Sequence, residues 1–426
     1  MKKFRKNNRL IASITLLVIS FFISAVSAQK VDESVTVVKG KVIDQNTQKP
    51  VSFANVFLVN SGVGTVSNID GEFIIKVPNS STSKTITVSF MGYKSVSYAL
   101  ADLKPESNTV VLTPQSVSIQ EVIVRTNDPL QLITNALHSV PDNYGSSPYL
   151  CTAFYRESVM ENKQYVGVAE AVLNIYKSSY KNEYEFDRSK VFKGCKSMDV
   201  KHMDTLIFKL RGGEHVAMLL DQAKNPETFL SPEYFSQYDY QPVSFTNIEG
   251  RETYVIEFKS KPDAPDAFYQ GKIYIDVSSL AIKKVDFNIN SDAFEIADKL
   301  LIIKKPAKTK VNTTSGTYTV DYRDLNGRWT LNHVRFEVKF KVDKKFHLFH
   351  KLYTSTVDLA ITDKDTVNVT RFRYNESIKP NDIFIEHVSN YSDPNFWGPY
   401  NIIKPEEPIE EAVERISKKM NKLKKS

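Results

Sequence analysis

The sequence predicts a mainly β protein: a small N-terminal β-sandwich, followed by a larger curved antiparallel β-sheet domain with a few helices. Two observations support this fold class. The chain is rich in strand-forming aromatic residues, with 21 Tyr and 25 Phe among its 426 residues. Short runs of alternating apolar residues, separated by turn residues, recur about every ten positions over 38–112, and longer alternating runs follow.

Residues 1–28 have the pattern of a secretory signal peptide. Five cations in the first nine residues precede an apolar run over 10–26, and small residues lead up to a cleavage point between Ala28 and Gln29. The alternative is an uncleaved anchor, because the run is about long enough to span a bilayer. We therefore expect an exported protein.

The charge balance changes once this leader is set aside. The formal net charge is +7, and the leader holds five positive and no negative charges, which leaves +2. A nearly neutral protein does not carry the basic surface that nucleic acids require, so no nucleic-acid partner is predicted. About 400 residues are more than a single hydrophobic core usually holds, so two or three domains are expected.

The chain has two cysteines, Cys151 and Cys195. Export to an oxidising compartment would let them form a disulfide. Two separately buried thiols are the other interpretation, and the favoured one, because free cysteine behaves as a small buried hydrophobe.

Four motifs occur in order in the first domain, at 40–44 (GKVID), 50–56 (PVSFANV), 64–73 (GTVSNIDGEF) and 86–93 (ITVSFMGY). Together they resemble the carboxypeptidase-regulatory-like domain, which is widespread in envelope proteins of Bacteroidetes, including the N-terminal extensions of TonB-dependent receptors. The resemblance implies a transthyretin-like sandwich of seven strands over 35–115, serving as an accessory module without catalytic residues. It also implies the periplasm or outer membrane of a Gram-negative, Bacteroidetes-like bacterium.

Neither enzymatic nor receptor function follows from that module. No His-x-x-Glu or His-Glu-x-x-His pattern occurs and the seven histidines are scattered, so no zinc peptidase site, other metal site or cofactor is predicted. A linker strand is expected at 116–126, but no receptor plug or long barrel follows it.

Residues 127–390 are expected to form one helix plus an antiparallel sheet. Asp128 is a suitable N-cap, Pro129 suits the first helical position, and Pro141 should end the helix. Asn326 and Gly327 predict a type I′ hairpin turn. Strands are predicted at 149–160, 164–176, 251–259, 271–277, 281–290, 316–323, 328–342, 351–361 and 367–374. An insertion at 181–245 is expected to cover one end or one face of the sheet.

Three segments of this sheet, at 271–276, 280–286 and 326–331, are similar to paired strands of LolA-like lipoprotein carriers. That resemblance implies a curved sheet around an apolar cavity for acyl chains.

Residues 391–426 combine an aromatic loop with an amphipathic helix. The loop contains Tyr391, Phe396, Trp397 and Tyr400, and serves either as a platform for a glycan or partner or, the favoured interpretation, as a plug for an open sheet edge. The helix has an apolar stripe at heptad spacing. Docking on the β domain is favoured over contact with a membrane surface or dimerisation.

The remaining polar candidates have ordinary explanations. His347 and His350 would lie on opposite faces of a strand, and His333 is expected on a solvent-facing position. The acidic pairs Asp292/Glu295, Asp363/Asp365 and Asp263/Asp266 fall in loops, where solvated turns are common. No nucleophile elbow or Cys-His signature occurs, so no catalytic residue is predicted.

The sequence therefore predicts an exported, non-enzymatic cell-envelope protein with a binding or assembly role. Its partner would be an envelope protein, or an apolar or glycan ligand, and its oligomeric state is left open. Two alternatives remain: a LolA-like carrier of a lipid or other apolar ligand, and a hydrolase of unknown type.

Overall fold

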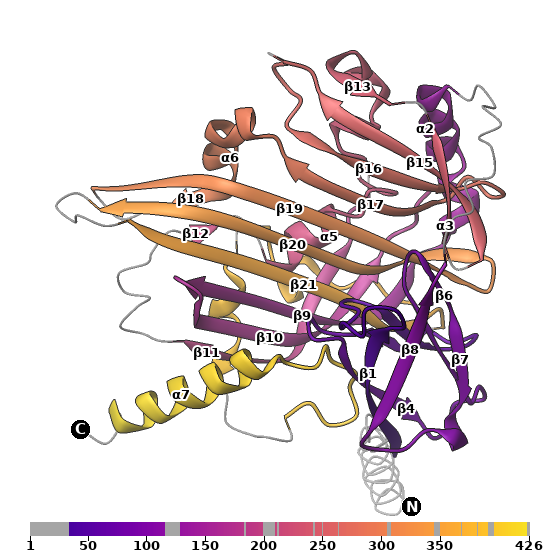
Figure 1. Cartoon of the computed structure of the whole chain (residues 1–426). Helices are drawn as coiled ribbons and strands as arrows, with labels where there is room; N and C mark the ends of the chain where they lie inside the picture. Colours follow the sequence, from indigo (N-terminus) through magenta and orange to yellow (C-terminus); the bar gives the residue numbers. More distant parts are fainter. Residues whose placement is uncertain are drawn as a thin grey trace, which may run out of the picture.

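The structure, a computed structural model, describes residues 34–115, 128–182, 185–198, 209–210, 213–241, 243–248, 250–262, 264–304, 308–344, 350–367, 369–380, 382–390 and 396–423. The fold is mainly β, as predicted, with a sandwich beside one end of a much larger sheet (Figure 1). The helices in these ranges include none that is long and apolar enough to cross a membrane. The leader with Ala28 and Gln29, and the linker at 116–126, lie outside the described residues.

The sandwich consists of two four-stranded sheets, in the orders β4-β1-β8-β6 and β3-β2-β5-β7. Their strands are β1 (Val35–Asp44), β2 (Asn55–Leu58), β3 (Gly64–Val66), β4 (Glu72–Pro78), β5 (Thr85–Ser89), β6 (Tyr93–Lys94), β7 (Val96–Ala99) and β8 (Asn108–Pro114). Alternate residues such as Phe73, Ile75 and Val77 point between the sheets and are buried. Each strand thus buries one face in the shared core.

The large sheet contains twelve of the described strands, in the order β13-β15-β16-β17-β19-β20-β21-β9-β10-β11-β22, with β14 paired to β15. The first three along the chain are β9 (Tyr149–Glu161), β10 (Gln164–Lys177) and β11 (Arg188–Met198), of which β11 lies within the expected insertion at 181–245. The rest are β13 (Tyr238–Tyr240), β14 (Ser244–Ile248), β15 (Arg251–Ser260), β16 (Tyr269–Asp276), β17 (Ile282–Ile289), β19 (Thr309–Leu325), β20 (Arg328–Lys344), β21 (Lys351–Asp365) and β22 (Ser389–Asn390). A separate short pair joins β12 (Lys209–Leu210) to β18 (Ile302–Lys304).

One face of this sheet, here called the inner face, carries the main hydrophobic core. Alternate residues of β20 from Val334 to Val342 point into it, as the sequence pattern predicted. Helices α2 (Pro129–His138), α3 (Val140–Tyr144) and α5 (Glu214–Leu219) cover it. Met218, Phe229 and Leu230, from the part of 181–245 between β11 and β13, also pack into this core.

Local signals explain the turns and caps. The Asp128 carboxylate accepts a hydrogen bond from the Leu130 amide at 3.0 Å and caps α2. Pro141 does not end the helical region, because it begins a further turn as the second residue of α3. Asn326 and Gly327 have φ of 57° and 80°, the left-handed values that a type I′ turn between β19 and β20 requires.

The strand predictions differ from the structure in two ways: one predicted strand is absent, and several observed strands, β11 the longest, were not predicted. The described residues of 367–374 form no strand. The strand β11 was not predicted, because its sequence RSKVFKGCKSM lacks a strict apolar alternation and its register against β10 contains a bulge.

The opposite face, here called the outer face, receives the sandwich. The Phe53 ring stacks on His333 with centroids 5.8 Å apart, and the Arg335 guanidinium lies 4.5 Å from the Phe53 ring centre. Asn332 donates to the Asn55 side-chain carbonyl at 2.7 Å. His333 was therefore wrongly predicted as exposed: its residue retains 1% of its accessible surface, because the sandwich covers this face.

A segment near the C-terminus, residues 396–404, crosses the junction and is here called the strap. The Asn401 side chain accepts from the Lys76 amide at 2.6 Å and donates to the Lys76 carbonyl at 3.0 Å. Lys404 pairs with Glu72 at 2.5 Å. Ile402 and Ile403 complete a small core with Val66 of the sandwich and with Phe154 and Ala360 of the sheet.

The last helix, α7 (Glu407–Leu423), follows the strap and lies along β10 and β11 (Figure 1). Ile409, Ala412 and Ile416 are buried, and Arg415 donates to the Tyr165 carbonyl at 2.8 Å. The favoured interpretation, docking on the β domain, describes this half of the helix. The side chains of Met420 and Leu423 lie outside the description.

Candidate functional site

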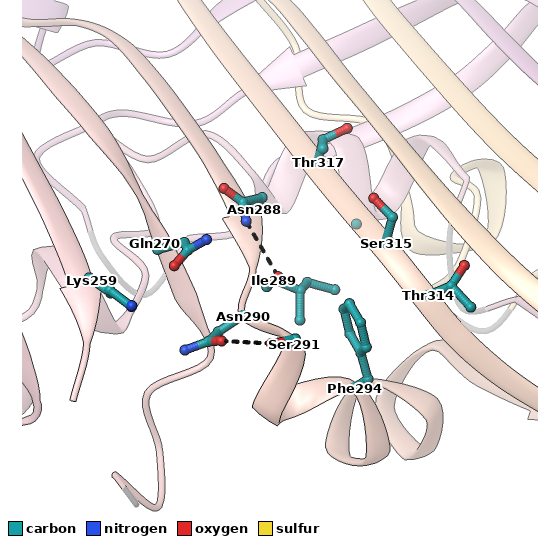
Figure 2. A pocket seen from close by; sticks show the side chains of 11 residues that line it. Lys259, Gln270, Asn288, Ile289, Asn290, Ser291, Phe294, Thr314, Ser315 and Thr317 are labelled. Atoms are coloured by element: carbon teal, nitrogen blue, oxygen red, sulfur yellow. Dashed lines mark hydrogen bonds between the residues drawn. The ribbon is translucent and has the colours of Figure 1, made fainter. Parts of the chain in front are cut away.

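A pocket of about 400 Å³ opens on the outer face, away from the sandwich, where β17 and β19 separate. Figure 2 shows its lining, which comes from the ends of β15, β16 and β17, from the middle of β19 and from the start of α6 (Phe294–Leu301). The lining residues are Lys259, Gln270, Asn288, Ile289, Asn290, Ser291, Phe294, Thr314, Ser315, Gly316 and Thr317.

The pocket exists because two neighbouring strands stop pairing. β17 pairs with β19 only as far as Asn288, opposite Thr317. Beyond that point Asn290 caps a 3₁₀ turn that leads into α6, while β19 continues against β20 alone. The Asp298 carboxylate of α6 accepts from the Thr313 amide at 2.5 Å, which fixes the helix over the gap.

A glycine sets how closely the base of the pocket is packed. A Cβ on Gly316 would lie 2.5 Å from Cδ1 of Ile289, closer than real Cβ contacts allow. The absence of a side chain at 316 therefore lets Ile289 fill the space between the separating strands.

Four polar side chains cross the pocket as one row on the outer face. Lys259 opposes Gln270, Gln270 opposes Asn288, and Asn288 opposes Thr317 in the strand registers. Directly opposed residues have Cβ atoms about 5 Å apart, so these four groups form a continuous polar strip. This set is here called the pocket row.

The pocket row has unused hydrogen-bonding capacity. Within the described residues, the Lys259 ammonium, the Gln270 amide and the Thr317 hydroxyl have no hydrogen-bond partner from the protein. Among the described residues, the Asn288 amide makes one hydrogen bond, a long one of 3.4 Å to the Ile289 carbonyl. The polar atoms are therefore available to a ligand or to water.

The adjacent row on the same face behaves differently. Lys272 donates to Glu257 at 2.7 Å, Thr319 donates to Asp286 at 2.8 Å, and Lys284 pairs with Asp286 at 3.0 Å. In this neighbouring row, the polar side chains of the outer face therefore have hydrogen-bond or ion-pair partners from the protein. Of these two neighbouring rows, the one that lines the pocket holds the unpaired groups.

The chemistry of the lining is that of recognition. It contains amides, hydroxyls, one ammonium, one aromatic ring and one aliphatic side chain, but no carboxylate, imidazole or thiol. Lys259 is the one lining side chain that could act as a base, and no hydrogen bond among the described residues joins it to a lining hydroxyl, so the pocket shows no nucleophile paired with a base. Donors and acceptors beside an aromatic ring suit the binding of a polar molecule.

A second polar cluster is buried in the protein interior. Asp221 accepts hydrogen bonds from Lys177 at 2.8 Å and from the hydroxyls of Tyr180 and Tyr322, both at 2.7 Å. Although burial acts in the opposite direction, the Lys177 charge and these bonds hold the pKa of Asp221 below its usual value. Asp221 retains none of its accessible surface, so this network joins the insertion to the sheet rather than facing a ligand.

A third candidate is a pair of acidic groups on the inner face. Burial raises the pKa of Glu157 to about 7 and that of Glu214 to about 8, and the charge of Glu157 adds to the effect on Glu214. The Tyr155 hydroxyl donates to Glu157 at 2.9 Å. Tyr155 packs edge-on against Phe384, with centroids 4.5 Å apart. The described ranges contain no group of three or more metal-ligating side chains.

The two cysteines are both free and buried, so the disulfide considered for them is not formed. Cys151 opposes Ile175 of β10, whereas Cys195 opposes Glu170 of the same strand. The two partner positions on β10 are five residues apart, which corresponds to about 16 Å along the strand. The Cα atoms of a disulfide lie within about 7 Å of each other, so the two cysteines are too far apart to form one. Burial raises the pKa of the Cys151 thiol to about 12.

The aromatic residues of the predicted platform or plug fall in the strap, apart from Tyr391, which lies outside the described residues. Trp397 packs edge-on against Phe154 at 5.5 Å, and Phe396 packs against Trp397 at 4.8 Å. Tyr400 contacts Phe192 at 5.1 Å. These rings attach the strap to the face of the sheet.

The remaining polar candidates are distributed over the molecule. His350, Asp292, Glu295, Asp363 and Asp365 are exposed, and none of them lines the pocket. His347 and Asp263 lie outside the described residues. The sequence analysis missed the pocket row, because its four members are spread over 59 positions of the chain and only the strand registers bring them together.

Comparison with known proteins adds to this description. Among curated proteins, no match was found. A solved structure with similarity is a DUF1329 family protein from Desulfovibrio piger ATCC 29098, with 11% identity and a TM-score of 0.27, covering 57% of this chain and 96% of that one. A likeness this weak assigns neither fold nor function. The family model of the CarboxypepD_reg-like domain matches residues 38–124. The N-terminal segment of this chain is therefore a carboxypeptidase-regulatory-like domain, as its motifs predicted.

Proposed function

We propose that this protein is an exported, non-enzymatic binding protein of the bacterial cell envelope, in the periplasm or at the outer membrane. The large sheet holds the ligand in the outer-face pocket, and the sandwich and strap support the sheet. One observation carries the proposal: the polar groups of the pocket row are unpaired, whereas those of the adjacent row are paired.

Two features favour binding over the alternatives. A hydrolase needs organised titratable groups in a cleft, and the pocket lining holds hydroxyls and Lys259 but no carboxylate, imidazole or thiol. A carrier of acyl chains needs an apolar cavity, but the inner face is packed with buried side chains such as Phe229, Phe340 and Ile256.

The test is native mass spectrometry of the full chain recovered from fractionated envelope, without added ligand. We expect a retained small molecule whose mass is lost from the variant Gln270→Ala/Asn288→Ala. The matched control is Glu257→Ala/Lys272→Ala, which removes a complete ion pair from the adjacent row and should retain the molecule. Equal loss from both variants, or no retained mass, would contradict the proposal.

An assembly role is tested on the same material by crosslinking and pull-down. Recovery of a specific envelope protein would support it. Recovery as a free monomer without a partner would leave ligand binding as the function and count against assembly.

A further inference from the structure

We infer that the ligand of the pocket is an acidic saccharide, a sugar unit that carries a carboxylate, as uronic acids do. This inference rests on the proposed binding function and specifies its ligand class. It is drawn from three properties of the lining: its charge, its hydrogen-bonding groups and its aromatic ring.

The charge of the lining favours an anion. Lys259 is its one ionisable side chain, and no carboxylate lines the pocket to neutralise it. Two carboxylates lie near Lys259 outside the lining, and both have another cation: Glu257 on the same strand pairs with Lys272 at 2.7 Å, and Asp239, opposite Lys259 on β13, pairs with Lys261 at 3.9 Å. The Lys259 ammonium is exposed and has no ion-pair partner among the described residues, so a ligand carboxylate can pair with it.

The uncharged groups match a molecule with many hydroxyls. Gln270 and Asn288 each offer an amide donor and an amide acceptor, and Ser315 and Thr317 offer hydroxyls that do both. A sugar ring presents hydroxyls of the same dual character at close spacing, so one ring can bond several members of the strip. A simple inorganic anion would leave most of these groups unused.

An aromatic ring adjoins the polar strip. Phe294, the first residue of α6, is half-buried and lies beside Ile289 at the edge of the pocket (Figure 2). The C–H face of a sugar can pack on such a ring while its hydroxyls face the amides. A volume of about 400 Å³ is at the small end of the usual range for ligand pockets, which suits a terminal or short saccharide.

The experiment measures binding to the full chain by calorimetry and by saturation-transfer NMR. The probes are a short galacturonic acid oligomer, its methyl ester and inorganic phosphate. The ester retains the rings and ring hydroxyls but lacks the charge, and phosphate carries charge without rings. We expect the acid to bind most tightly and phosphate least.

Three variants assign the contacts. Lys259→Met keeps the aliphatic stem and removes the charge, so it should weaken acid binding about tenfold or more and leave the ester unchanged. Phe294→Ala should weaken acid and ester alike. The double variant Glu257→Gln/Lys272→Met is the matched control, because it removes a complete ion pair one row away, outside the pocket lining. It should bind as the unmodified protein does.

Each outcome has a definite meaning. Equal binding of acid and ester, equal loss in the two lysine variants, or phosphate binding as tightly as the acid would overturn the acidic saccharide. If none of the three probes binds but the Gln270→Ala/Asn288→Ala variant loses a retained molecule, the inference fails while the proposed binding function stands. If there is neither probe binding nor a retained molecule, both fail.

Discussion

The rings of Phe53 and His333 stack across the junction between the sandwich and the large sheet, 5.8 Å apart and inclined by 23°. Phe53 has φ of 59°, a left-handed backbone conformation that is costly for a bulky residue, by about 1–3 kcal/mol. The contacts of the ring with His333 and Arg335 offset this cost. The junction is therefore a specific interface, and it should respond to changes on either side.

Replacement of Phe53 should uncouple the two modules. We expect Phe53→Ala to lower the free energy of unfolding by about 1–3 kcal/mol and to split one calorimetric transition into two, since the ring is the main apolar contact with His333. The control is Val111→Ala, an exposed position on β8 that should have little effect. An unchanged single transition in Phe53→Ala would contradict this role.

Asp358 should be essential for stability at neutral pH. It is buried and pairs with Arg335 at 2.6 Å and with His333 at 3.1 Å. Asp358→Asn keeps the shape but leaves Arg335 without its counterion, at a cost of about 3–5 kcal/mol. Denaturant unfolding at pH 7 measures the loss, and Glu414→Gln, in an exposed pair with Lys418, should cost about 0.5 kcal/mol or less.

The lowered pKa of Asp358 predicts that the protein loses stability in acid. Although burial opposes it, the charge of Arg335 and the hydrogen bond with His333 hold the pKa of Asp358 well below its usual value. A lowered pKa in the folded state means that the stabilisation is present above about pH 4 and is lost as the pH falls toward the folded pKa. The unmodified protein should therefore lose stability below pH 4 more steeply than Asp358→Asn.

The raised pKa values of Glu157 and Glu214 predict that the protein loses stability as the pH rises. Burial raises their pKa values to about 7 and about 8. A raised pKa means that their contribution is complete below the unfolded value near 4.5 and is lost as the pH rises through 7 to 8. The melting temperature should fall between pH 6 and pH 9, and the variant Glu157→Gln/Glu214→Gln should flatten that fall. A slope equal to that of the unmodified protein would refute the assignment.

Asn401 should hold the strap to the sandwich through two hydrogen bonds. Its side chain accepts from the Lys76 amide and donates to the Lys76 carbonyl. These are the two backbone bonds that a neighbouring strand would otherwise make with Lys76. Asn401→Ala should cost about 1–3 kcal/mol, because it leaves both backbone groups unsatisfied. Asn401→Asp should also destabilise, since a carboxylate cannot donate to the carbonyl. Limited proteolysis between the strap and α7 would report the detachment, and resistance equal to that of the unmodified protein would argue against it.

Much of the fold could be predicted because its signals are local. The alternation of β20, the Asn326–Gly327 turn and the Asp128 cap each depend on residues a few positions apart. His333 was misplaced because the same alternation only says which residues share a face. It does not say that a second module covers that face.

The candidate site could not be predicted for a related reason. Lys259, Gln270, Asn288 and Thr317 are unremarkable polar residues in their own strands, and their alignment depends on three strand registers, one of which includes a bulge. The pocket also requires β17 to leave β19 after Asn288, which the sequence indicates only as a polar stretch at 288–292. The alignment of these four side chains can be recognised only when the pairing of the strands is known.

The strap has a consequence for the order in which the chain can reach its native state. Asn401 and Lys76 are 325 residues apart, so their contact closes one of the longest loops in the molecule. During synthesis from the N-terminus, the sandwich is complete long before the strap exists. Until then Val66 lacks the cover that Ile402 and Ile403 provide in the native state, so a nascent chain exposes apolar surface at this edge of the sandwich.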